Sequence, residues 1–147
     1  MFEHARDAWR ARRTGREHAE RVTAAFRTPD YEGFERAYAI EAPQCVRRLY
    51  NLVKGPVPPF KIHAPDGATL EVQGLVPLSA DSIQQGARYA HKRLVIGYES
   101  DGGLLLVDLD SGLLFLDFPD QGVTDETDLS LDDLLVSLRA AGHADAG

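Results

Sequence analysis

The chain has 147 residues, a length that suits one domain with a core large enough to need no disulfide or metal. Its single cysteine, Cys45, cannot form an internal disulfide and has no neighbouring Cys or His at zinc-ligand spacing, which favours a reducing, cytoplasmic setting. Because no apolar run reaches the ~18 residues of a membrane span and the N-terminus lacks the apolar core of a signal peptide, we expect no membrane contact.

The net charge of −7 is distributed unevenly along the chain. Residues 1–27 hold seven Arg against four acidic residues, whereas residues 101–147 hold eleven acidic residues against Arg139 alone, a formal charge of −10. A field of that sign repels the phosphates of nucleic acids and accelerates the encounter with basic proteins. Direct nucleic-acid binding is therefore disfavoured, and a basic protein is the expected partner.

Residues 2–27 have the apolar spacing of a helix, and their arginines would coat the opposite face. Such a face is more often solvated than an RNA-binding arm. A second helix is expected to begin with Thr28 as N-cap and Pro29 at its first position. Its aromatic stripe of Tyr31, Phe34 and Tyr38 is interpreted as core packing.

The middle of the chain predicts short elements separated by turn residues. Pro43 opens a helix that runs to about Val53, and the Gly and Pro residues that follow end it. Residues 60–63 and 70–76 are strand candidates joined by a Pro-Asp-Gly turn. Ser79 is expected to cap a helix that reaches about residues 89–91.

Three apolar runs between residues 94 and 118 are separated by Gly-containing turns, which predicts a β-meander. If Ser111 and Gly112 form a two-residue loop, Asp108 lies opposite Phe115, and Leu106 lies opposite Asp117. One face of this hairpin is then wholly apolar and belongs to the core. It consists of Leu105, Val107, Leu109, Leu114, Leu116 and Phe118.

The second face of the hairpin mixes the carboxylates of Asp108, Asp110 and Asp117 with apolar side chains. It fits a surface that meets a partner, or one covered by helices whose arginines, such as Arg10 and Arg13, pair with the carboxylates. A divalent-metal site formed by the three carboxylates is a minor alternative, because no His lies beside them in sequence.

An acidic, mobile loop is expected from Asp120 to Asp128. Ser130 then begins the last helix with Asp133 in the capping-box position, and its leucines form one face that docks on the sheet. The fold class is therefore α+β, an antiparallel meander with N-terminal helices and a C-terminal helix packed on it.

No motif predicts catalysis. The five His residues show no helical metal-site spacing, Cys45 is interpreted as a structural thiol, and the Gly pair at 102–103 does not lead into a helix. A pocket in which His63, His91 and Cys45 converge would be needed to favour an enzyme. No catalytic, cofactor-binding or metal-binding residue is predicted.

The order of elements resembles the SUKH superfamily. The resemblance rests on Pro29-Asp30-Tyr31, on the meander with its turns at Asp101-Gly102-Gly103 and Asp110-Ser111-Gly112, and on the leucine-rich helix 131–138, and it covers residues 28–140. That family includes yeast cell-wall assembly regulators and many bacterial immunity proteins, which bind and neutralise polymorphic toxins, many of them nucleases. The resemblance implies one domain over residues 1–147, with an Arg-rich helix at 1–27, a core at 28–140 and a flexible tail at 141–147.

The predicted function is non-catalytic binding of a basic toxin domain, as an immunity protein in the cytoplasm. Regulation or scaffolding through an endogenous protein, bound by the Arg-rich N-terminal helix, is the alternative. The residues predicted to contact the partner are Asp108, Asp110, Phe115, Asp117, Asp120, Asp125, Glu126 and Asp128.

Overall fold

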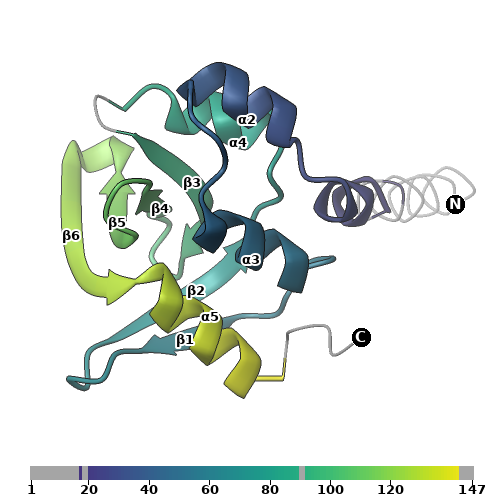
Figure 1. Ribbon diagram of the computed structural model, residues 1–147. Helices are drawn as coiled ribbons and strands as arrows, with labels where there is room; N and C mark the ends of the chain where they lie inside the picture. Colours follow the sequence, from purple (N-terminus) through teal and green to yellow (C-terminus); the bar gives the residue numbers. More distant parts are fainter. Residues whose placement is uncertain (1–16, 18–19, 90–91, 143–147) are drawn as a thin grey trace, which may run out of the picture.

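The computed structural model describes residue 17 and residues 20–89 and 92–142. Within this part of the chain, six strands form one antiparallel, curled sheet in which every strand pairs with its neighbours in sequence (Figure 1). Helices lie over one face of this sheet (Figure 1). The expected α+β meander with N-terminal helices and a C-terminal helix is confirmed.

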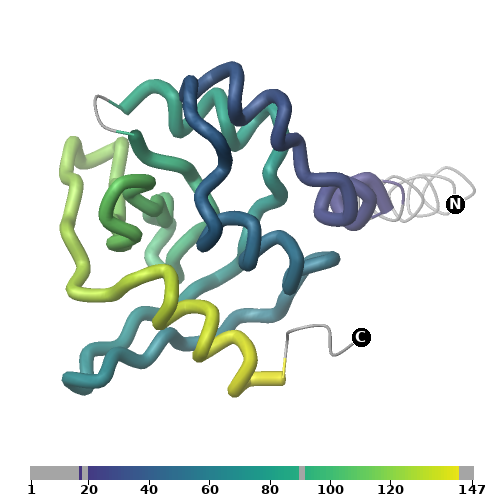
Figure 2. The backbone as a smooth tube through the Cα atoms, viewed as in Figure 1, coloured from purple at the N-terminus to yellow at the C-terminus, as the bar shows by residue number. Residues whose placement is uncertain are grey.

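The strands cross the sheet in the order of the chain, as the steady change of colour along the tube shows (Figure 2). β1 and β6 are therefore the two edge strands. The six are β1 (Phe60–His63), β2 (Thr69–Leu75), β3 (Arg93–Glu99), β4 (Leu104–Asp108), β5 (Leu113–Phe118) and β6 (Val123–Ser130).

The helices are α2 (Tyr31–Tyr38), α3 (Gln44–Leu52), α4 (Ala80–Gly86) and α5 (Leu131–Ala140), and residues 20–27 end an earlier helix. α2 packs beside α4, α4 lies against β3, and α5 packs against β1. In the described residues, no helix has the length and apolar character needed to cross a bilayer.

The first helix agrees with the prediction where it is described. Residues 20–27 are helical, and the other residues of the expected helix, except residue 17, lie outside the described part of the chain. Phe26 is fully buried and Val22 packs against the core, whereas Arg21 and Arg27 are exposed. These last turns thus bury an apolar face and turn their arginines to solvent.

The predicted start of the second helix is wrong. The N-cap of α2 is Asp30, whose carboxylate accepts a hydrogen bond from the N–H of Gly33 at 2.9 Å. The hydroxyl of Thr28 instead donates to a carbonyl of the preceding helix at 2.9 Å, and Pro29 lies before the N-cap. Thr and Asp are both good caps, so residue type alone does not distinguish them.

The aromatic stripe of α2 packs into the core, as expected. Phe34 is fully buried, and its ring centroid lies 4.7 Å from that of Tyr38. The Tyr38 hydroxyl donates to the carbonyl of Arg93 at 2.6 Å, which connects α2 to the start of β3. Burial raises the pKa of Tyr38 to about 12, so its hydroxyl stays a donor over a wide pH range.

Both later helices begin with capping boxes. In α4 the hydroxyl of Ser82 accepts from the N–H of Ser79 at 3.0 Å. In α5 the carboxylate of Asp133 accepts from the N–H of Ser130 at 2.9 Å, and the Ser130 hydroxyl accepts from the N–H of Asp133 at 3.2 Å. Both predicted starts are confirmed, but α4 ends at Gly86, earlier than expected.

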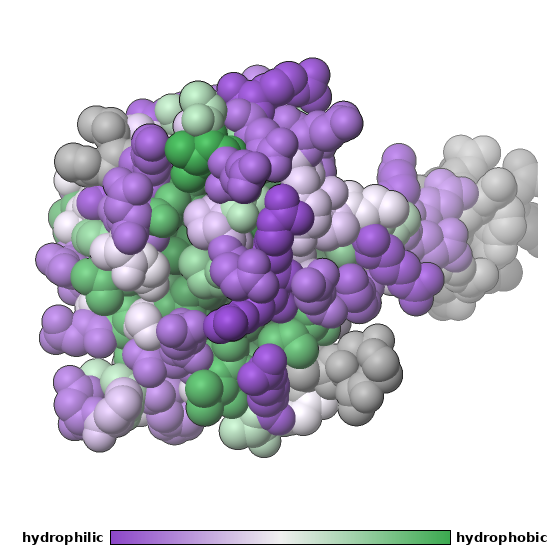
Figure 3. Space-filling model, in the orientation of Figure 1, coloured by the Kyte–Doolittle hydropathy of each residue, from purple (hydrophilic) through white to green (hydrophobic). Residues whose placement is uncertain are grey.

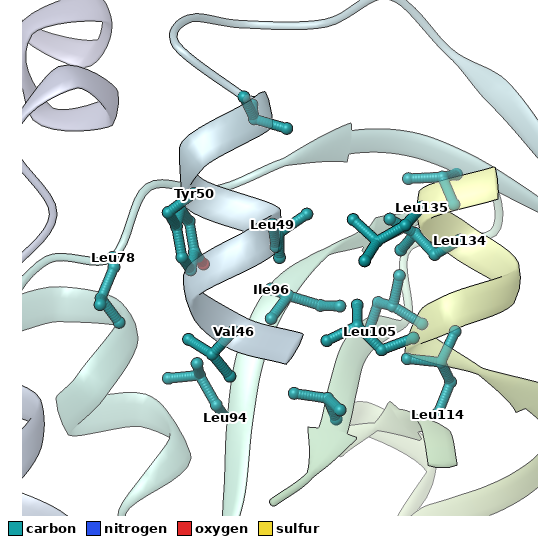
Figure 4. Close-up of a cluster of buried hydrophobic side chains, with 14 of the residues drawn as sticks. Val46, Leu49, Tyr50, Leu78, Leu94, Ile96, Leu105, Leu114, Leu134 and Leu135 are labelled. Carbon is teal, nitrogen blue, oxygen red and sulfur yellow. The ribbon is translucent and has the colours of Figure 1, made fainter. Parts of the chain in front are cut away.

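The core lies between the helices and the inner face of the sheet. Figure 4 shows α3 side chains directed at the strands and α5 side chains closing the same cluster. All of them are at most 4% exposed: Val46, Leu49, Tyr50, Leu94, Ile96, Leu105, Leu114, Leu134 and Leu135. The leucine face of α5 thus docks on the sheet as predicted.

The β4–β5 hairpin has the predicted faces but not the predicted register. Phe115 pairs with Leu106, not with Asp108, and Asp117 pairs with Leu104, not with Leu106. The connection is longer than two residues, and Gly112 adopts a φ of 75° at its end. Because the register differs by two residues, each side chain keeps its face, and the apolar face packs in or against the core.

Candidate functional site

The strand that follows β5 forms an exposed edge of the sheet. A 3-10 turn, η1 (Pro119–Gln121), and Gly122 with a φ of 65° reverse the chain and lead into β6. The mobile loop expected at 120–128 is therefore wrong, because these residues form a turn and a strand. Residues 123–126 are all exposed, since an edge strand has a neighbour on one side only.

Four carboxylates line this turn and strand, and we name them the acidic edge. They are Asp120, Asp125, Glu126 and Asp128, and all four are exposed. Within the described part of the chain, none of them has an ion-pair partner. No Lys, Arg or His occurs between residues 94 and 138, so the carboxylates of this stretch outnumber the nearby guanidinium of Arg93, which lies over Phe115, and the local field is negative. Hydrophilic side chains recur along the left margin of Figure 3, where β6 lies in Figure 1.

The other edge of the sheet is covered. α5 packs against β1, and the backbone N–H of His63 donates to the hydroxyl of Ser137 on α5 at 3.0 Å. Uncovered edges invite pairing with other chains, and a helix laid along the edge prevents it. α5 also contacts β6, which it directly follows, but residues 123–126 of this edge stay exposed.

The second face of the sheet is partly covered, and Asp117 lies beneath that cover. Val95 and Leu106 are fully buried there, although neither belongs to the main core. The hydroxyls of Tyr89 and Thr124 donate to the two carboxylate oxygens of Asp117, the second at 3.0 Å. Asp117 is only 8% exposed, so the expectation that it meets a partner is corrected: it is an internal acceptor.

Phe115 and Asp108 are also engaged within the chain. The guanidinium carbon of Arg93 lies 3.9 Å from the Phe115 ring centroid, a cation–π contact that covers the expected apolar anchor. The carboxylate of Asp108 accepts from the N–H groups of Asp110 and Ser111 at 3.0 and 2.9 Å. Burial raises the pKa of Asp108, but these hydrogen bonds and the charge of Arg93 outweigh it and hold the pKa below its ordinary value.

The cover of this face was expected from N-terminal arginines, but Arg10 and Arg13 lie outside the described residues. Tyr89, from the segment after α4, and Arg93, the first residue of β3, contact this face in their place. This role could not be predicted, because a tyrosine at an expected helix end and an arginine just before an expected strand are ordinary surface residues. Of the eight predicted contact residues, Asp110 and the four of the acidic edge are exposed.

The described residues contain no group of three or more His, Cys, Asp and Glu that could hold a metal ion. Cys45 packs against the core, and burial together with the nearby charge of Asp132 raises the pKa of its thiol, the opposite of an activated nucleophile. His63 is exposed on β1, and His91 lies outside the described residues. A hollow of about 420 Å³ beside α4 is lined by residues that include Arg88 and Tyr98 but no His or Cys.

No protein-family model, curated protein or solved structure matches this chain. The resemblance to the SUKH superfamily therefore stays a prediction that depends on the motifs alone. The function is argued below from the geometry and charge of β6 and its surroundings.

Replacing Tyr89 with phenylalanine removes one of the two hydrogen bonds to the buried carboxylate of Asp117. We expect the free energy of unfolding to fall by about 1 kcal/mol, because the hydroxyl of Thr124 still binds the other oxygen. Urea denaturation measures the change. Thr127→Val, which removes a hydroxyl bound to a backbone carbonyl of β5, gives a comparison on the same strand pair.

The hydrogen-bonded tyrosines Tyr89 and Tyr38 predict a loss of stability at alkaline pH. Burial raises the pKa of Tyr89 from 10.0 to about 12; the hydrogen bond to Asp117 adds to this shift, and the charge of Arg93 opposes it. Burial also raises the pKa of Tyr38 from 10.0 to about 12. Their contribution to stability is therefore complete below pH 10 and lost as the pH rises toward 12. Unfolding curves at several alkaline pH values should show this loss reduced in the Tyr89→Phe variant.

Proposed function

We propose that this chain is a non-catalytic binding domain that acts as an immunity protein in the cytoplasm, neutralising a basic toxin domain by direct contact through the acidic edge. The observation that carries the proposal is the open edge strand β6, whose exposed carboxylates have no ion-pair partner in the described residues. A nuclease is one class of toxin that fits, because it needs a positive cleft to hold phosphates.

The charge pattern supports a protein partner rather than a nucleic acid. The carboxylates of the acidic edge repel phosphates and attract Lys and Arg side chains, and such fields raise association rates at low salt. An immunity protein has to capture its toxin before the toxin reaches its target. Fast, electrostatically guided association is therefore suited to this task.

The fold supports the same proposal, because the carboxylates are placed by backbone pairing. β6 pairs with β5 through Phe115, Leu116, Asp117 and Phe118, so Asp125 and Glu126 project from a strand instead of a free loop. Binding then costs little ordering of the backbone, which favours affinity. A loop of the same composition would lose more conformational entropy on binding.

The second candidate function is regulation or scaffolding through an endogenous protein bound by the Arg-rich N-terminal segment. The arginines of residues 1–27 support it, with Arg21 and Arg27 exposed at the end of the first helix. The two functions differ in the charge of their partners. A basic partner favours the acidic edge, and an acidic partner favours the arginines.

Reversing the charge of the acidic edge tests the proposal. We expect Asp125→Lys with Glu126→Lys to abolish protection when the chain is co-expressed with its toxin domain, which is sought among the genes beside its own. With purified proteins, the double variant should weaken the complex by about tenfold or more at low salt, mainly through slower association. Growth rescue and surface plasmon resonance at about 0.02 M and about 0.5 M salt measure these effects.

A matched control changes the net charge equally but elsewhere. Glu32 and Glu41 are exposed on α2 and on the segment before α3, so Glu32→Lys with Glu41→Lys should retain protection and most of the affinity. Equal loss of affinity in the two double variants would assign the effect to net charge and contradict the placement of the site. Undiminished protection by the β6 variant would contradict the proposed function itself.

A further inference from the structure

The hydrogen bonds of β5 determine which backbone N–H and C=O groups of β6 point toward β5 and which point to solvent. The carbonyl of Leu114 accepts from the hydroxyl of Thr127 at 2.8 Å, and the carbonyl of Gly112 accepts from the N–H of Leu131 at 2.8 Å. Both carbonyls of this strand region therefore face β6. Successive residues of a strand turn their backbone groups to opposite edges. The backbone N–H and C=O groups of Leu116 and Phe118 therefore also point toward β6.

The partners of these residues turn their own backbone groups inward. Asp125 pairs with Leu116, and Val123 pairs with Phe118, so the N–H and C=O groups of Asp125 and Val123 point toward β5. Those of Thr124 and Glu126 point away from the sheet. The edge thus presents two N–H donors and two C=O acceptors to solvent, spaced as in a strand that awaits a neighbour.

The side chains beside these groups select which strand can pair. Asp125 projects on the face of Leu116, whereas Glu126 projects on the face of Phe115, so both faces of the edge carry a carboxylate. A strand with Lys or Arg on both faces would place opposite charges across the new pairing, whereas a second copy of β6 would place like charges there. The acidic edge therefore admits a basic strand and opposes self-pairing.

We propose that β6 binds its partner by strand addition, with an extended basic segment pairing to the backbone of Thr124 and Glu126 and extending the sheet by one strand. This inference rests on the proposed function, because it specifies how the acidic edge would hold a basic protein. Strand addition takes its affinity from the backbone and its specificity from side chains. The partner segment is therefore extended, and it carries adjacent basic residues, one for each face, flanked by small or β-branched residues.

The probe is a blocked seven-residue peptide in which adjacent Lys residues, one for each face of a strand, are flanked by Thr and Val. It is added to the full chain, and amide hydrogen exchange is followed in NMR spectra. We expect the amides of Thr124 and Glu126 to exchange about tenfold more slowly with peptide, because they become hydrogen-bonded. The amide of Asp125 is the internal reference, since its pairing with Leu116 already protects it. A peptide with Glu in place of Lys should have no effect.

Two variants at one position separate the backbone from the charge. Glu126→Gln keeps the outward N–H and should weaken peptide binding by about two- to fivefold. Glu126→Pro removes that N–H without removing a bond to β5 and should weaken binding by a further tenfold or so. Circular dichroism and the unfolding midpoint confirm that both variants fold, and the exchange experiment on the unchanged chain tests the proposal independently of them.

Absence of peptide binding, or binding without slower exchange at Thr124 and Glu126, would overturn strand addition. Equal affinities of the Glu126→Pro and Glu126→Gln variants would overturn it as well. In each case, toxin neutralisation that still depends on Asp125 and Glu126 would leave the proposed function standing with side-chain contacts alone. If charge reversal leaves neutralisation unchanged, the proposed function fails whatever the peptide does.

Discussion

Replacing Leu105 with alanine is expected to lower the free energy of unfolding by about 2–5 kcal/mol, the usual range for truncation of a fully buried leucine. Leu105, the second residue of β4, is 0% exposed, and in Figure 4 it lies between strand residues and the leucines of α5. The loss of stability has two parts: the free energy gained by moving the leucine side chain out of water is lost, and the remaining cavity adds a further cost. Because the backbone ladder of β4 holds the strand in place, the site cannot collapse fully.

Urea denaturation at equilibrium measures this effect. Val136 on α5 is 65% exposed, so Val136→Ala should change stability by less than about 0.5 kcal/mol. A loss below about 1 kcal/mol at Leu105 would mean that the sheet repacks, and the assignment of this residue to the centre of the core would be wrong. The control distinguishes burial from a general effect of removing an aliphatic side chain.

Replacing Gly97 with alanine is expected to lower the free energy of unfolding by about 1–3 kcal/mol through overpacking. A Cβ at this position would lie 2.5 Å from the carbonyl oxygen of Gly74 on the neighbouring strand. That oxygen belongs to the backbone, so it cannot move aside as a flexible side chain does. β2 would have to shift where it pairs with β3, next to the irregularity between Val72 and Gly74.

Gly74 provides the matched control, because it lies on the partner strand. Apart from Gly74 itself and its two chain neighbours, no atom lies within 4 Å of a Cβ built at this position, and the φ of Gly74 is not in the left-handed region. Gly74→Ala should therefore be neutral or stabilise the protein by up to about 1 kcal/mol, since glycine loses more backbone entropy on folding. Thermal unfolding of both variants tests the pair. Similar midpoints for the two would contradict the close approach of β2 and β3 at Gly97.

The sequence predicted best where a pattern repeats. The side-chain faces of the β4–β5 hairpin were predictable because alternation is strict in strands, and a register error of two residues leaves faces unchanged. The start of α5 was predictable because Ser130 and Asp133 form a capping box. In these cases a local rule and the tertiary packing favour the same structure.

The sequence located the carboxylates of the acidic edge but did not predict that they lie on a strand. β6 is exposed along most of its length, so it lacks the alternation of apolar residues that marks a half-buried strand. Asp117 could not be recognised as buried, because its cover comes from Tyr89 and Thr124, on either side of it in the chain. Such contacts depend on how the sheet curls, and periodicity contains no information about that curl.

The contact between α5 and β1 has a consequence for synthesis of the chain. Every strand of the sheet pairs with the strand before it, so hairpins can form in turn as the polypeptide leaves the ribosome. The hydrogen bond from His63 to Ser137, however, joins residues 74 positions apart. β1, which is synthesised before the other strands, is therefore covered last. A nascent chain that ends before α5 exposes both edges of its sheet.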